Sequence, residues 1–215
     1  DLMAEYVIGY LLLHERHMLA HYAAQQAGRW HHVWPGMLRG KTMGILGVGS
    51  IGAAVAETAK HFGMRTYGYT RSSTDCAFVD QYFHGSLLEF VAEVDYLVCT
   101  LPHTAANEHL IDRTVLQAMK PTAVLINGGR GSAIDEAALL IALQQNEIAL
   151  AVLDVFQREP LPPEHPFWAA PNLLMTSHTA APTLPELIVP IFAENYRRFV
   201  NKQPLNYQVE FGRGY

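Results

Sequence analysis

Gly47-Val48-Gly49-Ser50-Ile51-Gly52 is the stretch that decides the fold of this chain. It follows an apolar strand candidate at residues 41–46, and apolar residues recur behind it at helical spacing. Glycines in this GxGxxG pattern permit a tight turn, a close approach of backbone to a pyrophosphate and close packing of helix on strand. The amides of Ser50 and Ile51 open the helix, where partial positive charge favours an anion. We therefore predict a dinucleotide-binding turn and disfavour a glycine-rich turn without a ligand.

Strand and helix patterns alternate along the rest of the chain. Short apolar strand candidates are found at residues 65–70, 95–100, 123–127, 149–155 and 173–176. Helix candidates lie at residues 4–13 and at 136–145, the latter starting after Asp135. Two more helices are expected where the pairs Ser86/Glu89 and Thr183/Glu186 form capping boxes. Gly63 is placed to end the helix that follows the glycine turn. This alternation predicts the α/β class: a doubly wound parallel sheet, that is, a Rossmann-type NAD(P)-binding domain.

Composition narrows the classes of protein further. Half of the 215 residues are hydrophobic and 16% are charged, which is enough apolar material for a packed core. The net charge of −5 argues against nucleic acid and anionic membranes as partners. The apolar run 6–13 is too short to span a bilayer, and Cys76 and Cys99 are too few for a disulfide framework. We expect a cytoplasmic protein with reduced thiols.

The end of the second strand predicts which dinucleotide binds. An NAD site usually places an acidic residue there, about 20 residues beyond the turn, to bind the ribose 2′-hydroxyl. This chain has Thr70-Arg71-Ser72 instead, and its next carboxylate is Asp75. An arginine beside hydroxyl groups suits the 2′-phosphate of NADP, so we expect NADP(H) to be preferred and NAD(H) to stay possible. The alternative for Arg71 is a solvated surface arginine.

Three charged residues follow later strands, where open α/β sheets bind their ligands. Arg130 stands in the glycine-rich run 127–131, Glu159 in the run 153–161 and His178 in the run 176–181. Each has a structural alternative: a capping or salt-bridge arginine, a surface acid paired with Arg158, and a satisfied core histidine. The other histidines show no ligand spacing, and we expect no metal.

These stretches together resemble the nucleotide-binding part of the D-isomer-specific 2-hydroxyacid dehydrogenases. The matching segments run in order at residues 4–7, 47–52, 101–104, 127–131, 153–160 and 177–181. Within that family the chain is most similar to bacterial glyoxylate/hydroxypyruvate reductases, through residues 70–72, 158–164 and 212–215.

The resemblance implies a role for each matching residue. Arg130 would bind the carboxylate and carbonyl oxygens of the substrate, and His178 would be the general acid/base with Glu159 as its partner. Asp154 would lie near the nicotinamide. The remaining cofactor contacts would come from the phosphate turn, from 70–72 and from a set lining the groove: Leu101, Pro102, Thr104, Gly129, Arg130, His178 and Ala180.

The implied activity is hydride transfer from NADPH or NADH to a small 2-keto acid, such as glyoxylate or hydroxypyruvate, giving the 2-hydroxy acid. A cationic arginine stabilises charge that builds on the carbonyl oxygen, and a histidine beside a carboxylate is a suitable proton donor. Two alternatives stay open: an NAD(H)-binding sensor or corepressor-like module, and another D-2-hydroxyacid specificity. A formate dehydrogenase-like enzyme is disfavoured, because that branch lacks an acid at Glu159.

The resemblance also implies a domain organisation. Residues 1–202 would form the dinucleotide-binding domain, with 1–24 as an interdomain helix, and 203–215 would return toward a substrate domain that this chain lacks. Gly129 stands where many members carry Ala or Ser, which we expect to loosen the turn before Arg130. A homodimer is implied. The opening helix and the polar connection 25–39, which contains Trp30 and Trp34, are candidates for its contact, with packing of the two rings inside the chain as the alternative.

Overall fold

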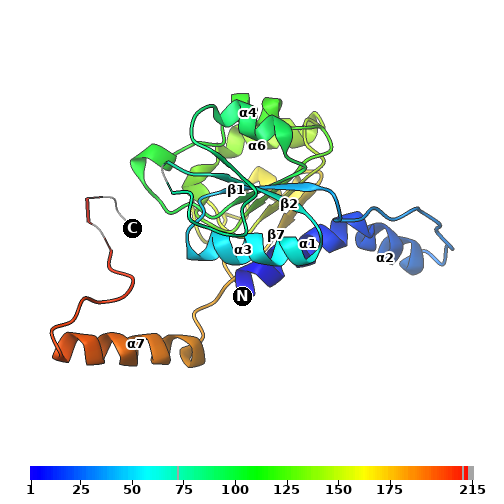
Figure 1. Ribbon diagram of the computed structural model, residues 1–215. Helices are drawn as coiled ribbons and strands as arrows, with labels where there is room; N and C mark the ends of the chain where they lie inside the picture. The colour runs from blue at the N-terminus through cyan, green and yellow to red at the C-terminus, as the bar shows by residue number, and fades with distance from the viewer. Residues whose placement is uncertain (72, 210, 213–215) are drawn as a thin grey trace. The chain divides into compact units, whose positions relative to one another are not determined.

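The structure is a computed structural model that describes residues 1–71, 73–209 and 211–212. Over these residues the chain builds a seven-stranded parallel sheet in the order β3-β2-β1-β4-β5-β6-β7 (Figure 1). The strands are β1 (Thr42–Leu46), β2 (Arg65–Tyr69), β3 (Gln81–Phe83), β4 (Tyr96–Cys99), β5 (Val124–Asn127), β6 (Leu150–Leu153) and β7 (Leu173–Met175). The strand order reverses between β1 and β4, which is where such sheets bind dinucleotides. The predicted doubly wound sheet is confirmed.

Helices cover both faces of the sheet. In Figure 1, α1 and α3 lie on one face, and α4 and α6 on the other. The helices of this unit are α1 (Leu2–Glu15), α2 (Met18–Gln26), α3 (Ser50–His61), α4 (Leu87–Glu93), α5 (Arg113–Ala118) and α6 (Glu136–Gln144). Alternate residues of one strand enter different cores: Leu125 packs with α4, α5 and α6, whereas Val124 and Ile126 pack with α1 and α3.

Short polar side chains and one glycine set the ends of the helices. Ser86 and Asp135 accept hydrogen bonds from backbone amides in the first turns of α4 and α6, as the sequence predicts. Asp112 does the same for α5, a helix that our sequence analysis missed. Gly63, at φ +71°, follows α3 and donates to the Lys60 carbonyl, so its predicted role as helix terminator is confirmed.

Two expected helices differ in the structure. Residues 1–24 are not one helix, because His17 takes a left-handed φ of +51° and separates α1 from α2. The last helix, α7 (Pro185–Val200), begins behind Leu184 and has no side-chain cap, so the predicted capping role of Thr183 is wrong. Strand β3 was also missed, because three residues at the sheet edge leave too short a pattern to detect.

The chain divides into two compact units, residues 1–180 and 181–215. In the second unit α7 carries exposed apolar side chains, including Phe192 and Phe199, and Asn195 exchanges two hydrogen bonds with the backbone of Asn206. The predicted domain limits 1–202 and 203–215 stay a prediction, and the expected contributions of Ser72 and of residues 213–215 lie outside the described residues. No helix within the described ranges has the length and apolar character needed to cross a membrane.

Candidate active site

The turn between β1 and α3 has the backbone shape that a pyrophosphate needs. Gly47 adopts φ +92°, and a Cβ on Gly52 would lie 2.2 Å from the Gly47 carbonyl oxygen, so only glycine lets α3 start this close to β1. A Cβ on Gly49 would meet no atom within 4 Å, which leaves its surface open to a ligand. The first residues of α3, Ser50 and Ile51, are exposed and can present their amides to an anion.

The residues after β4 form the next part of the predicted cofactor groove. The Thr100 hydroxyl donates to the Gly47 carbonyl at 2.7 Å, and Leu101 packs against the side of Gly47 that has no side chain. The Thr104 hydroxyl oxygen is buried without a hydrogen-bond partner, which is unfavourable unless a ligand or water supplies one. Pro102 accepts from Asn107 through its carbonyl and is half-buried. The open turn and the unpaired Thr104 oxygen fit a bound dinucleotide.

The end of β2 offers hydroxyl and cationic groups in place of a carboxylate. The Thr70 hydroxyl donates to the Ser73 carbonyl at 2.6 Å, and His84 Nδ1 lies 3.0 Å from the Thr70 carbonyl oxygen. Arg71 is exposed directly beyond the strand. A 2′-phosphate could be bound here, whereas a ribose 2′-hydroxyl would find no acid at Thr70.

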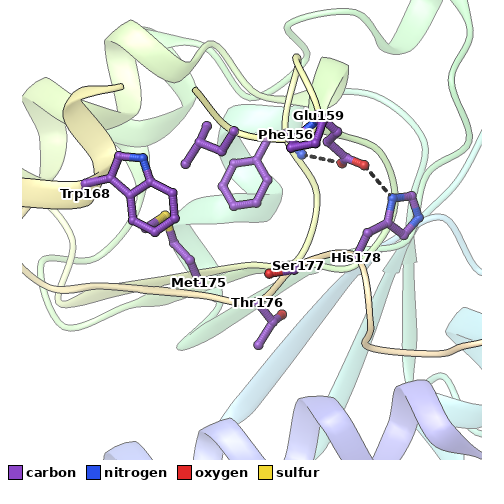
Figure 2. A pocket seen from close by; sticks show the side chains of 9 residues that line it. Phe156, Glu159, Trp168, Met175, Thr176, Ser177 and His178 are labelled. Carbon is purple, nitrogen blue, oxygen red and sulfur yellow. Dashed lines mark hydrogen bonds and ion pairs between the residues drawn. The ribbon is translucent and has the colours of Figure 1, made fainter. Parts of the chain in front are cut away.

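Glu159 and His178 form a hydrogen-bonded pair beyond β6 and β7. His178 Nδ1 lies 2.7 Å from Glu159 Oε2, and Glu159 Oε1 accepts from the Phe156 amide at 2.9 Å (Figure 2). Burial opposes ionisation of Glu159, but the hydrogen bonds from His178 and Phe156 outweigh it, so the pKa of this carboxyl lies below its usual value. The His178 side chain is 52% exposed, and its second ring nitrogen, Nε2, points away from Glu159 (Figure 2). With Nδ1 held by Glu159, Nε2 is the ring nitrogen that can exchange a proton with a ligand.

Arg130 follows β5 on the same edge of the sheet. Asn127, Leu153 and Met175 are in register across β5, β6 and β7, so residues that follow these strands leave the sheet at one edge. Arg130 is exposed, and its guanidinium donates to the Gly129 carbonyl at 2.7 Å. The structure thus brings Glu159 and His178 into contact and places Arg130 on their edge without a hydrogen bond to either.

Gly129 does not loosen the turn before Arg130, and that expectation is wrong. Its amide donates to Asn127 Oδ1, and a Cβ here would lie 2.7 Å from the Leu101 carbonyl oxygen. The backbone after β4 therefore occupies the space that an alanine methyl would need, and the turn is closely packed.

Asp154 lies beneath the loop that carries His178. It is 2% exposed, and its carboxylate accepts from the Thr176 hydroxyl and from the amides of Thr179 and Ala180. Ala180, a predicted cofactor contact, is itself buried. Thr176 was not among the predicted site residues, although a hydroxyl residue just before the Ser177-His178 pair was a visible signal.

A cavity of about 440 Å³ lies beside the Glu159–His178 pair. Figure 2 shows Trp168, Met175 and Phe156 around it. Its lining is Phe156, Glu159, Pro160, Leu161, Trp168, Met175, Thr176, Ser177 and His178. Since Nε2 of His178 points away from these side chains, the cavity lies on the other side of the pair from this nitrogen (Figure 2).

In the part of the chain that the structure describes, the remaining titratable side chains do not gather into a metal site. Within the described ranges, no three His, Cys, Asp or Glu side chains stand close enough to hold an ion. Cys76 and Cys99 are free thiols, and burial raises the pKa of the Cys99 thiol to about 11, which leaves it unreactive.

Comparison with known proteins agrees with this geometry. Residues 8–180 match the family model described as D-isomer specific 2-hydroxyacid dehydrogenase, NAD binding domain. The chain is 34% identical over 214 residues to glyoxylate/hydroxypyruvate reductase A of Klebsiella pneumoniae subsp. pneumoniae, covering 99% of this chain and 69% of the relative. It is 45% identical over 149 residues to glyoxylate reductase of Aeropyrum pernix, covering 68% of this chain and 44% of that enzyme.

Solved structures extend the comparison. An NADPH-dependent glyoxylate/hydroxypyruvate reductase from Sinorhizobium meliloti, in complex with NADP and sulfate, superposes with a TM-score of 0.93 at 30% identity, over 100% of this chain and 69% of that one. A family member from Aeromonas salmonicida superposes with a TM-score of 0.92 at 41% identity, over 98% of this chain and 68% of that one. The chain thus spans less than the full length of each of these relatives. With its GxGxxG turn, parallel sheet and paired Glu159 and His178, this chain belongs to the D-isomer specific 2-hydroxyacid dehydrogenases and contains their NAD binding domain.

Proposed function

We propose that the full-length protein reduces a small 2-keto acid, such as glyoxylate or hydroxypyruvate, to the 2-hydroxy acid, with NADPH preferred over NADH. The observation that carries this proposal is the 2.7 Å pair of His178 and Glu159 on the sheet edge that also holds the phosphate turn. The names of the relatives, glyoxylate reductase and glyoxylate/hydroxypyruvate reductase, support the substrate class.

The reaction needs a proton and charge stabilisation at the substrate's carbonyl oxygen. A reduced nicotinamide, when bound, would supply the hydride for C2 of the substrate. Arg130 binds the substrate carboxylate and stabilises the negative charge that develops on the carbonyl oxygen. His178 holds the proton on Nε2 and donates it to that oxygen, while Glu159 on Nδ1 fixes the orientation of the ring.

Preference for NADPH rests on the end of β2. Arg71 can form charge-assisted hydrogen bonds to a 2′-phosphate, and Thr70 replaces the acid that would select NAD. The Sinorhizobium relative is described as NADPH-dependent, which supports the same choice. The other predicted contacts, among them Leu101, Pro102 and Asp154, belong to this proposal as residues of the cofactor groove.

We also propose a homodimer in the cytoplasm. The connection between α2 and β1 exposes Trp30 by 97% and Trp34 by 82%, so the two rings do not pack inside the chain. Large exposed aromatic side chains of this kind are favoured in the cores of interfaces. The free thiols of Cys76 and Cys99 support a reducing compartment.

The proposal is tested by a substrate panel on the full-length protein. Glyoxylate, hydroxypyruvate, pyruvate and larger 2-keto acids are assayed with NADPH and NADH in parallel. We expect the highest kcat/KM for glyoxylate or hydroxypyruvate with NADPH. Reduction of none of these acids with either cofactor would contradict the proposed activity.

A further inference from the structure

The loop that carries His178 is anchored on one buried carboxylate, Asp154. Oδ1 of Asp154 accepts from the Thr176 hydroxyl at 2.5 Å and from the Thr179 amide at 2.8 Å, and Oδ2 accepts from the Ala180 amide at 3.0 Å. The backbone carbonyl of Asp154 accepts from the His178 amide at 2.8 Å. Residues on both sides of the histidine are therefore tied to the end of β6.

His178 depends on this anchoring because of its own backbone. Its φ is +57°, a left-handed conformation that is unfavourable for a residue with a Cβ and persists only where the surroundings fix it. The side chain is 52% exposed, so packing around the ring restricts it little. Its alignment with Glu159 must therefore come largely from the hydrogen bonds of the loop.

Tyr6 of α1 completes the set of hydrogen bonds around this anchor. Its hydroxyl lies 2.8 Å from the Thr176 hydroxyl oxygen, across 170 positions of sequence. The Thr176 hydroxyl donates its proton to Asp154, so its oxygen accepts from Tyr6. Burial raises the pKa of the Tyr6 phenol, which therefore keeps the proton that it donates.

We propose that Tyr6 is a positioning residue: through Thr176 and Asp154 it fixes the loop of His178 and so holds the imidazole against Glu159. Loss of the phenol leaves the Thr176 oxygen with an unsatisfied acceptor in a half-buried site, and the Thr176 hydroxyl is then free to turn away from Asp154. The inference rests on the proposed function only in naming His178 as the proton donor. The hydrogen-bonded set itself is independent of the substrate.

The test compares variants that remove one hydroxyl with matched variants that keep the set intact. Tyr6→Phe and Thr176→Val each remove one hydroxyl of the set. Thr176→Ser retains it, and Tyr22→Phe removes an exposed hydroxyl from α2. Each variant of the chain is followed by ¹³C NMR of the Glu159 carboxyl carbon and ¹⁵N NMR of the His178 ring across the acid range.

The Glu159 carboxyl reports on the pair directly. Its pKa is lowered by His178 and by the Phe156 amide against the opposing effects of burial and of the Asp154 charge. We expect Tyr6→Phe and Thr176→Val to raise the pKa of Glu159 and to shift the His178 ring signals, whereas Thr176→Ser and Tyr22→Phe leave both in place. In the full-length protein, Tyr6→Phe should lower kcat about tenfold with KM unchanged, a part of what a positioned proton donor contributes.

Unchanged Glu159 and His178 signals in Tyr6→Phe and Thr176→Val would overturn the proposal, even if both variants melt at lower temperature. That result would leave Tyr6 with a structural hydrogen bond alone. A substrate panel without turnover, together with a shifted Glu159 titration, would reject the proposed function and uphold the positioning role.

Discussion

The phosphate turn and the catalytic edge of this domain are built in different ways. Six consecutive residues, 47–52, form the turn, and the groups that it can present to a ligand are backbone amides beside glycines. The edge beyond β5, β6 and β7 depends on side chains from separate segments, among them Glu159 and His178, and on Tyr6 from the far end of the chain. The first region is specified locally, whereas the second exists only once the sheet has formed.

The largest effect on turnover should follow from a substitution of His178 that leaves the phosphate turn unchanged. His178→Gln in the full-length protein removes the proton donor, and positioned proton transfer contributes about 10²–10⁴-fold to rate. We expect kcat to fall by that factor while NADPH affinity, measured by fluorescence titration, stays unchanged because the turn is intact. His61→Gln, on an exposed position of α3, serves as the control. Undiminished turnover in His178→Gln would contradict the role of His178 as the proton donor.

Arg71→Ala removes the cation that we propose to bind the 2′-phosphate of NADPH and leaves the phosphate turn unchanged. A charge-assisted hydrogen bond contributes about 1.5–3 kcal/mol, so NADPH affinity should fall roughly 10- to 150-fold and NADH affinity should change little. The control is Arg65→Ala, at the opposite end of β2. Calorimetric titration of both cofactors decides the point, and equal losses for NADPH and NADH would remove the 2′-phosphate argument.

Gly52→Ala tests whether the turn depends on close packing. The added methyl would lie 2.2 Å from a backbone oxygen, and overpacking of this kind costs about 1–3 kcal/mol. We expect urea denaturation to show that loss of stability together with weaker NADPH binding. Gly9→Ala is the matched control, since its Cβ meets nothing within 4 Å on α1. Equal stability of the two variants would mean that α3 does not need to start so close to β1.

The smallest expected effect is the contribution of the Glu159–His178 pair to the pH dependence of stability. Because the pKa of folded Glu159 is lowered, its ionisation stabilises the fold above its usual pKa of about 4.5. This stability is lost as the pH falls from there through the folded pKa. Glu159→Gln lacks the contribution, so its free energy of unfolding should decrease less steeply than the wild type's over that acid window. Parallel slopes in denaturation series at several pH values would show that the pair adds nothing to stability.

The same contrast explains what the sequence could predict. The turn and the long strands carry local patterns, so the parallel sheet and the tight glycine turn were foreseen from residues such as Gly47 and Gly52. The break between α1 and α2 was not, because nothing in the local pattern marks the left-handed conformation of His17. Strand β3 was too short to detect, although α5 could have been found from Asp112 as a helix cap followed by Val115 and Leu116.

The candidate site shows the same limit. Glu159 and His178 were singled out from their motifs, and the structure places them in hydrogen-bonding contact. Their support was not foreseen, because Tyr6 and Thr176 meet only through the tertiary fold. The close packing of Gly129 against the backbone of Leu101 was missed for the same reason.

A crystal structure of the full-length protein with NADPH and oxalate, an unreactive mimic of the substrate acid, would show whether cofactor and substrate meet at Arg130 and His178. We expect the pyrophosphate at the amides of Ser50 and Ile51, the 2′-phosphate at Arg71, and oxalate held by Arg130 with an oxygen within hydrogen-bonding distance of His178 Nε2. A nicotinamide bound away from Arg130 and His178, or oxalate held by other residues, would contradict it.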